Sequence, residues 1–245
     1  MRYFILVLFF PLLCAAQQEK TTRILFILDA SNSMNSTWGN QTRLVGAKEV
    51  LIQAMEMFKE VPNTEIALRV YGHQVPITND IQDCNDTKLE VPFSIGNIDI
   101  IKNKIRGLIA KGATPIARSL EAAAGDFPDT LSRNVIILIT DGLESCDNNP
   151  CVIAKKLREK GIKVTPFVIG LGMDLSYLEN FACIGSYSDA EDKDSFKSVL
   201  TTIIEKILTR TTVQINLNDS FKKPTETINR NYQMTISDTA ANQLI

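Results

Sequence analysis

The sequence predicts an open, doubly wound α/β fold: a mostly parallel sheet covered by helices on both faces, with one antiparallel edge strand. Three near-continuous apolar runs lack the polar alternation of a half-exposed strand, which predicts central parallel strands at residues 24–28, 135–139 and 164–169. Segments with helical periodicity lie between these runs, and such alternation is typical of parallel strands joined by right-handed crossovers. A weaker, alternating run at 88–93 contains Pro92 and predicts the edge strand.

Helices are expected between these strands, and a further strand at 65–72 follows the first of them. In each helical segment, apolar residues recur at intervals of three and four, as on the buried face of an amphipathic helix. This pattern predicts helices at residues 44–58, 101–109, 116–123, 152–157 and 196–207. Asn149 and Pro150 have the residue types of a helix N-cap and first turn, which supports a helix start just before residue 152.

The first 16 residues have the pattern of an export signal. Arg2 precedes an apolar stretch at residues 3–13, and small residues occupy positions −3 and −1 of a cleavage point after Ala16. This stretch is too short to cross a bilayer, which needs about 20 residues. We therefore predict a cleaved signal peptide at residues 1–16, no transmembrane span, and a secreted, periplasmic or cell-surface protein. An uncleaved anchor and a buried N-terminal strand are the alternatives.

The pattern of apolar and polar residues changes after Arg210. Residues 211–245 hold alternating apolar and polar positions around a turn-rich stretch, which predicts the start of a β-sandwich-like domain. Two or three strands cannot close such a core. We expect that this segment is truncated; the alternative is that a partner completes the sheet.

Four cysteines follow the predicted signal peptide: Cys84, Cys146, Cys151 and Cys183. An even number in an exported chain predicts two disulfides, with free buried thiols as the alternative. The short spacing makes Cys146 and Cys151 a candidate pair, which would leave Cys84 with Cys183, but the sequence does not choose among the three connectivities. A zinc site is disfavoured because no paired CxxC motifs or adjacent histidines are present.

The charge balance bears on the class of partner. The 245 residues include 26 Lys and Arg against 28 Asp and Glu, a formal net charge of −2, and no basic cluster is present. Nucleic acids and anionic membrane surfaces are recognised through concentrated positive charge. We therefore expect neither as a partner.

Polar side chains follow the predicted strands at the positions where an open α/β sheet binds ligands. Asp29, Ser31 and Ser33 follow the first strand, and Asp141 follows the strand at 135–139. Thr114 lies just before a predicted helix. Three hydroxyls and two carboxylates suit a small, hard dication such as Mg²⁺, with one coordination position left open.

These five residues, in this order, resemble the metal-ion-dependent adhesion site of the von Willebrand factor type A domain, which has the form D-x-S-x-S followed by a threonine and an aspartate. The resemblance covers residues 22–209. It implies that the two serines and the threonine contact Mg²⁺, with Mn²⁺ or Ca²⁺ as alternative ions, and that the two aspartates act directly or through water. It also implies that an Asp or Glu of a partner protein fills the open position.

Further short stretches look like an exported bacterial subgroup of this family, in which a β-sandwich segment often follows the domain. These stretches are Tyr71-Gly72-His73, Asp83-Cys84, Leu143-Glu144-Ser145-Cys146 and Pro150-Cys151. The function that the resemblance implies is a metal-dependent protein-binding or adhesion module of an exported protein. The alternative is a structural cell-envelope scaffold without metal-dependent ligand binding.

The sequence does not favour an enzyme. A phosphoaspartyl nucleophile at Asp29 would want a second acid two residues later, where Ser31 stands. His73 has no serine in a G-x-S-x-G motif to activate. Gly170 and Gly172 lack the third glycine of a dinucleotide-binding loop.

Two further side chains have a plain structural interpretation beside a functional one. His73, the only histidine, is predicted to be a hydrogen-bonded loop residue rather than a metal ligand. Trp38 lies beside the predicted metal turn and is either a partner contact or a loop-packing residue.

Overall fold

The computed structural model describes residues 21–146, 149–159, 164–171 and 181–209. The predicted signal peptide at 1–16 and the predicted sandwich segment at 211–245 lie outside these ranges. Within them, no helix combines the length and the apolar character that a membrane crossing requires.

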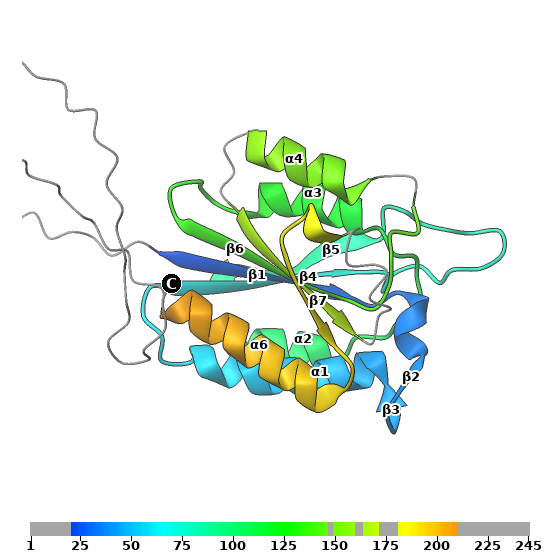
Figure 1. Ribbon diagram of the computed structural model, residues 1–245, viewed down its shortest axis with the longest axis horizontal. Helices are drawn as coiled ribbons and strands as arrows, with labels where there is room; N and C mark the ends of the chain where they lie inside the picture. The colour runs from blue at the N-terminus through cyan, green and yellow to red at the C-terminus, as the bar shows by residue number, and fades with distance from the viewer. Residues whose placement is uncertain (1–20, 147–148, 160–163, 172–180, 210–245) are drawn as a thin grey trace, which may run out of the picture. The chain divides into compact units, whose positions relative to one another are not determined.

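Six strands form one sheet in the order β5-β4-β1-β6-β7-β8 (Figure 1). In that order the strands are Thr87–Ser94, Thr64–Tyr71, Thr22–Asp29, Arg133–Thr140, Val164–Leu171 and Ser186–Ala190. Only β5 runs antiparallel to its neighbour, and it lies at the edge. The predicted fold class is therefore confirmed. The short, polar strand β8 is an addition that the apolar pattern did not predict.

Helices cover both faces of the sheet (Figure 1). One face carries α1, α2 and α6, which span Arg43–Ala54, Ile98–Arg106 and Lys193–Leu208. The other face carries α3 and α4, which span Ile116–Asp126 and Pro150–Glu159. Two 3₁₀ turns, η1 and η2, span Asn32–Asn35 and Met55–Phe58, and a small hairpin joins β2 (Thr37–Trp38) to β3 (Gln41–Thr42).

The second predicted helix is displaced from its expected bounds. The sequence pattern placed it at 101–109, whereas α2 begins at Ile98 and ends at Arg106. Ile109 is 67% exposed, so the apolar residue that extended the predicted helix is not part of the core. The segment after α2 instead runs as a loop toward the carboxyl end of β1.

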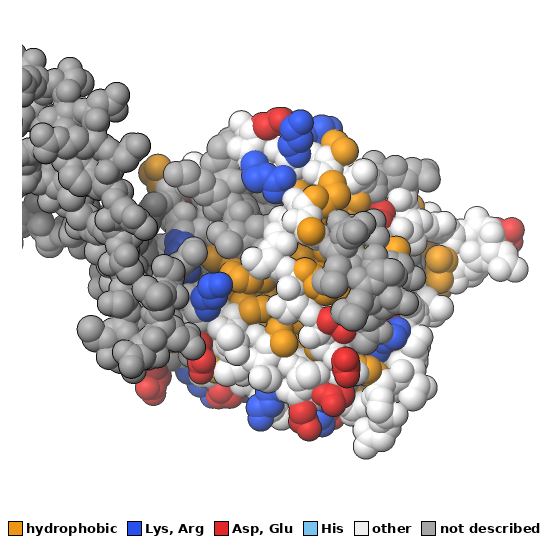
Figure 2. Space-filling view, in the orientation of Figure 1, with side chains coloured by type: hydrophobic (Ala, Val, Ile, Leu, Met, Phe, Trp, Pro, Cys, Tyr) orange, Lys and Arg blue, Asp and Glu red, His pale blue; other side chains and the backbone are white. Residues whose placement is uncertain are grey.

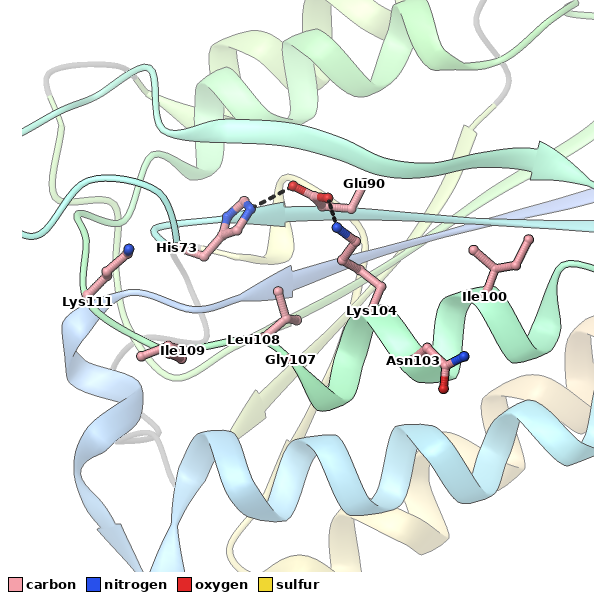
Figure 3. Close-up of a pocket in the computed structure, with 9 residues that line it drawn as sticks. All are labelled: His73, Glu90, Ile100, Asn103, Lys104, Gly107, Leu108, Ile109 and Lys111. Carbon is pink, nitrogen blue, oxygen red and sulfur yellow. Dashed lines mark hydrogen bonds and ion pairs between the residues drawn. The ribbon is translucent and has the colours of Figure 1, made fainter.

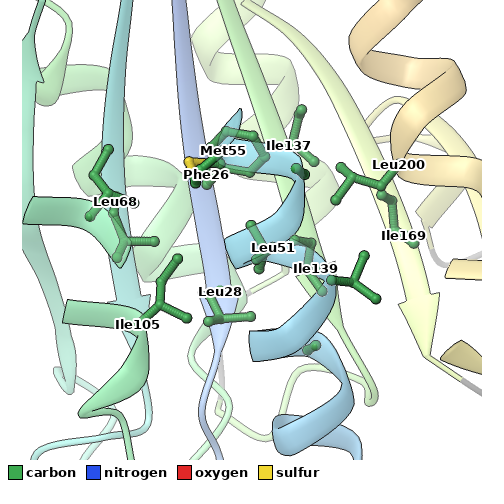
Figure 4. Packing of buried hydrophobic residues seen from close by; sticks show 14 of the residues in the cluster. Phe26, Leu28, Leu51, Met55, Leu68, Ile105, Ile137, Ile139, Ile169 and Leu200 are labelled. Atoms are coloured by element: carbon green, nitrogen blue, oxygen red, sulfur yellow. The ribbon is translucent and has the colours of Figure 1, made fainter. Parts of the chain in front are cut away.

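The central strand β1 shows why a continuous apolar run marks a doubly covered strand. Ile24, Phe26 and Leu28 pack in the core on the side of α1, α2 and α6 (Figure 4), and Leu25 and Ile27 pack on the side of α3 and α4. All five are fully buried. Because burial of each such side chain contributes about 1.5–3 kcal/mol, this strand is fixed in place by both layers.

The strand order creates a switch point beside β1. If β2 and β3 of the hairpin are left out and the six sheet strands are numbered along the chain, their order in the sheet is 3-2-1-4-5-6. The chain therefore proceeds from β1 toward one edge of the sheet, and from β6 toward the other. Ligands of open α/β folds bind in the crevice at the carboxyl ends of such a strand pair. Asp29 ends β1, and Asp141 follows the last residue of β6.

The candidate disulfide between Cys146 and Cys151 is wrong. Cys84 bonds to Cys146, and Cys151 bonds to Cys183. Helix α4 starts between the two neighbouring cysteines: the N–H of Cys151 donates to the Asn149 side chain in its first turn. This helix carries Cys151 to Cys183, whereas Cys146 remains in the loop beside Cys84.

Candidate functional site

Asp29 is a buried carboxylate that three donors hold in place. The backbone N–H of Ser31 donates to its Oδ1 at 2.7 Å. The hydroxyl groups of Tyr71 and Thr140 donate to its Oδ2, both at 2.8 Å. Asp29, Tyr71 and Thr140 are the last residues of the three adjacent parallel strands β1, β4 and β6. The sheet itself therefore sets the orientation of the carboxylate.

A chain of polar contacts connects the loop after β1 to the loop after β6. Ser31 Oγ lies 3.0 Å from Ser33 Oγ, and Ser33 Oγ donates to Asp141 Oδ1 at 2.7 Å. Arg43 Nη1 forms an ion pair with Asp141 Oδ2 at 3.0 Å. The structure therefore brings Ser31, Ser33 and Asp141 together next to Asp29. The sequence predicted this meeting of two segments that lie far apart along the chain.

Thr114 reaches the same edge through its backbone. Ser31 and Gly112 form a parallel bridge, and Asn32 N–H donates to Gly112 O at 2.9 Å. The N–H of Thr114 donates to Ser145 Oγ at 2.8 Å, which ties it to the loop after β6. The loops of all five predicted ligands thus meet at the carboxyl edge of the sheet.

Gly72 permits the close approach of these loops. Its φ is +68°, and a Cβ added there would lie 2.5 Å from Ala113 O and 2.7 Å from Ser31 N. Its carbonyl accepts from the N–H groups of Lys111 and Gly112 at 3.3 and 2.8 Å. A residue with a side chain at this position would push apart the segments that carry Ser31 and Thr114.

Two acidic side chains, Asp29 and Asp141, interact electrostatically at this edge. Burial and, next to it, the charge of Asp141 together raise the pKa of Asp29 to about 6, against the hydrogen bonds from Ser31 and Thr140, which lower it. Burial also raises the pKa of Tyr71, so its hydroxyl stays a donor. Two carboxylates and three hydroxyls are hard oxygen ligands, and this donor set fits a divalent cation such as Mg²⁺. No group of three or more His, Cys, Asp and Glu side chains suited to a metal occurs in the part of the chain that the structure describes.

Trp38 anchors the loop that follows the two serines. It is only 6% exposed, its ring lies 6.3 Å from that of Phe196, and its Nε1 donates to Glu191 O at 2.5 Å. A Cβ on Gly46 of α1 would lie 2.8 Å from the indole ring. Trp38 is therefore a loop-packing residue and presents little surface to a partner.

A pocket of about 590 Å³ lies between β5 and α2, and none of the five predicted ligands lines it (Figure 3). His73 Nε2 lies 3.0 Å from Glu90 Oε1, and Lys104 pairs with Glu90 Oε2 at 2.7 Å. Burial opposes ionisation of Glu90, but hydrogen bonds from Lys104, His73 and Lys88 outweigh it and lower its pKa to about 2. The prediction that His73 is a hydrogen-bonded loop residue is confirmed.

Four residues that contact the candidate ligands were not predicted as site residues. Tyr71 and Thr140 orient Asp29, Arg43 pairs with Asp141, and Ser145 binds the backbone of Thr114. The first two end apolar strands beside Asp29, so their position at strand ends was a usable signal. Nothing in the sequence linked Arg43 to a residue 98 positions away.

The chain is similar to known proteins over most of its length. Residues 24–144 match the family model of the von Willebrand factor type A domain. The chain is 27% identical over 192 residues to the uncharacterized protein YwmD of Bacillus subtilis (strain 168), covering 75% of this chain and 85% of YwmD. It is 26% identical over 211 residues to YwmC of the same organism, covering 82% and 90%.

Solved structures share the fold. The conserved hypothetical protein BatB from Bacteroides thetaiotaomicron has a TM-score of 0.58 at 20% identity, and the match covers 76% of this chain and 98% of the BatB chain. The pilus adhesin SpaC from Lactobacillus rhamnosus GG has a TM-score of 0.64 at 15% identity, over 78% of this chain and 31% of SpaC. The minor pilin PilB from Streptococcus sanguinis has a TM-score of 0.60 at 14% identity, over 78% and 62%. The chain is thus similar to the von Willebrand factor type A domain over residues 24–144, and the solved structures share its fold.

Proposed function

We propose that this chain is a protein-binding or adhesion module of an exported protein, in which Asp29, Ser31, Ser33, Thr114 and Asp141 hold a divalent cation. The observation that carries the proposal is the contact chain from Ser31 through Ser33 to Asp141 beside the buried Asp29. A bound Mg²⁺ would supply an electrophilic centre with a vacant position for a carboxylate of another protein.

Different neighbouring groups position the different proposed ligands. Tyr71 and Thr140 fix Asp29 from the sheet, and the bridge between Ser31 and Gly112 sets the distance between the first two loops. Because these contacts come from strand ends and backbone groups, Asp29 and Ser31 are held in place without an ion. Such rigidity favours a selective, oriented contact with a partner.

Another protein is the proposed partner. On the face shown in Figure 2, basic side chains gather mainly over α4, and acidic side chains lie mostly toward the opposite edge. The family match and the likeness to a pilus adhesin and a minor pilin support an interaction or adhesion role. Two disulfides in the described residues are in keeping with an extracellular or surface location.

The first test is Mg²⁺-dependent thermal stabilisation of the full chain. We expect Mg²⁺ to raise the melting temperature of the wild type, because an ion that binds only the folded state stabilises it. Ser33→Ala removes a proposed ligand and is expected to abolish most of this shift. Ser36→Ala, three residues along the same exposed loop, is the matched control and should keep it. Equal shifts in all three proteins, or none in the wild type, would count against the metal site.

The alternative function, a cell-envelope scaffold without metal-dependent binding, makes the opposite prediction for partners. Capture of an envelope protein that survives both EDTA and Asp29→Ala would favour the scaffold. Capture that is lost under either condition would favour the adhesion module.

A further inference from the structure

Arg43 is a cation that the protein itself places on the candidate metal site. Its Nη1 lies 3.0 Å from Asp141 Oδ2; the Asp141 side chain is fully buried and that of Arg43 is 21% exposed. The backbone N–H of Arg43 donates to Ser36 O at 3.1 Å, which holds the start of α1 against the loop that carries the two serines. The guanidinium thus lies at the rim of the site, between its buried carboxylate and the outside.

This position is unfavourable for an arginine unless the carboxylate compensates for it. Arg43 is the first residue of α1, directly after the N-cap Thr42. A positive charge at a helix N-terminus is opposed by the helix dipole. The ion pair with Asp141 offsets that cost and at the same time neutralises a carboxylate that would otherwise be buried without a counter-charge.

The pair also uses the second oxygen of Asp141. Ser33 occupies Oδ1 and Arg43 occupies Oδ2, so both oxygens of this predicted ligand already have partners. A divalent cation close to the same carboxylate would be repelled by the guanidinium, and repulsion between charges is strong where water is largely excluded. The arginine and the ion therefore compete for one carboxylate.

We propose that Arg43 is an internal competitor of the divalent cation: it neutralises Asp141 in the metal-free protein, and the ion binds as Arg43 gives up this pair. This inference rests on the proposed function, and it adds that one residue sets the metal affinity. Its consequence is a site that stays folded without metal and binds the ion more weakly than its five oxygen ligands alone would allow.

The test is the affinity of the full chain for Mg²⁺, measured by calorimetry in wild type, Arg43→Gln and Arg43→Lys. We expect Arg43→Gln to bind Mg²⁺ about tenfold more tightly or better, because the competing charge is gone. Arg43→Lys keeps the charge and should stay within about threefold of wild type. Arg106→Gln removes an exposed arginine at the end of α2 and controls for the change in net charge.

A second readout separates competition from a merely structural role. In EDTA, Arg43→Gln should melt at a lower temperature than wild type, because it leaves Asp141 buried without a counter-charge. Saturating Mg²⁺ should reverse this order or remove the difference. If Arg43→Gln does not fold in EDTA, Arg43→Met, which keeps the aliphatic part of the side chain, replaces it in both measurements.

The outcomes distinguish this inference from the function on which it rests. If the wild type binds Mg²⁺ and the neutral variant, Arg43→Gln or its replacement Arg43→Met, binds it no more tightly, Arg43 positions Asp141 instead of competing for it, and only the inference fails. If wild type and variants all fail to bind Mg²⁺, the proposed metal site fails together with the inference.

Discussion

At the scale of single residues, the candidate site depends on groups that no ligand motif contains. Asp29, Ser31 and Ser33 are recognisable in the sequence by their spacing, but Tyr71 and Gly72 fix where they lie. The positions of Tyr71 and Gly72 follow from the parallel register of β1 and β4, which places Tyr71 beside Asp29. The sequence motif supplies the candidate ligands, whereas the neighbouring strand end determines how Asp29 is oriented.

Gly72→Ala tests the close approach of the site loops. We expect a loss of at least about 2 kcal/mol in the free energy of unfolding, from the unfavourable positive φ and from contact with Ala113 O. Mg²⁺ stabilisation should fall as well, because the segments of Ser31 and Thr114 separate. Gly39→Ala is the matched control: its φ is +65°, but nothing lies within 4 Å of the added Cβ. Urea unfolding of both variants measures the difference, and equal losses would contradict the steric account.

Glu90 makes a separate prediction about pH, away from the proposed ligands. Its pKa is lowered to about 2 in the folded protein, so its contribution is present above the ordinary value near 4.5 and is lost as pH falls from there toward 2. Glu90→Gln should cost about 1–3 kcal/mol at pH 7, since it weakens bonds to Lys104 and His73. The variant should lose less stability than wild type between pH 5 and pH 2, measured by urea unfolding at each pH. Parallel losses would show that the Glu90 network contributes nothing.

At the scale of elements, the sequence predicts well where burial alone decides and poorly where distant partners decide. The runs that became β1, β6 and β7 are predicted because helices cover both faces of each. Strand β8 is polar and, among the described strands, pairs with β7 alone. The β2–β3 hairpin depends on Trp38 packing beside α1 and α6. The disulfide pairing depended on where α4 begins, which spacing between cysteines does not encode.

The two disulfides should have different effects on the site. Cys146 lies in the loop that begins at Asp141, and in this loop Glu144 accepts from Ala117 N–H at 2.6 Å. Replacing Cys84 and Cys146 by serine should cost about 2–5 kcal/mol and also weaken Mg²⁺ binding, because the loop loses its tether.

The matched comparison is the replacement of Cys151 and Cys183, which join α4 to the segment before β8. This change should lower stability by a similar amount and leave the Mg²⁺ affinity unchanged. Melting temperatures and calorimetric titrations of both double variants provide the comparison. Equal affinities in the two variants would show that the disulfide of Cys84 does not support the site.

At the scale of the whole molecule, the strand order explains why five residues from three segments share one edge. The strand order reverses between β1 and β6, and the bridge from Ser31 to Gly112 joins the loop before α3 to the loop after β1. The sequence predicted that the five candidate ligands lie at one edge, because strand ends could be located from apolar runs. It could not predict that Arg43 pairs with Asp141, because that contact depends on how α1 lies against the sheet.

The most direct test is a crystal structure of the full chain grown with Mn²⁺ and measured for anomalous scattering. The account predicts one strong anomalous peak bounded by the hydroxyl oxygens of Ser31, Ser33 and Thr114, with the Arg43 guanidinium moved away from Asp141. No peak at this edge at saturating Mn²⁺, with Arg43 still paired to Asp141, would contradict it.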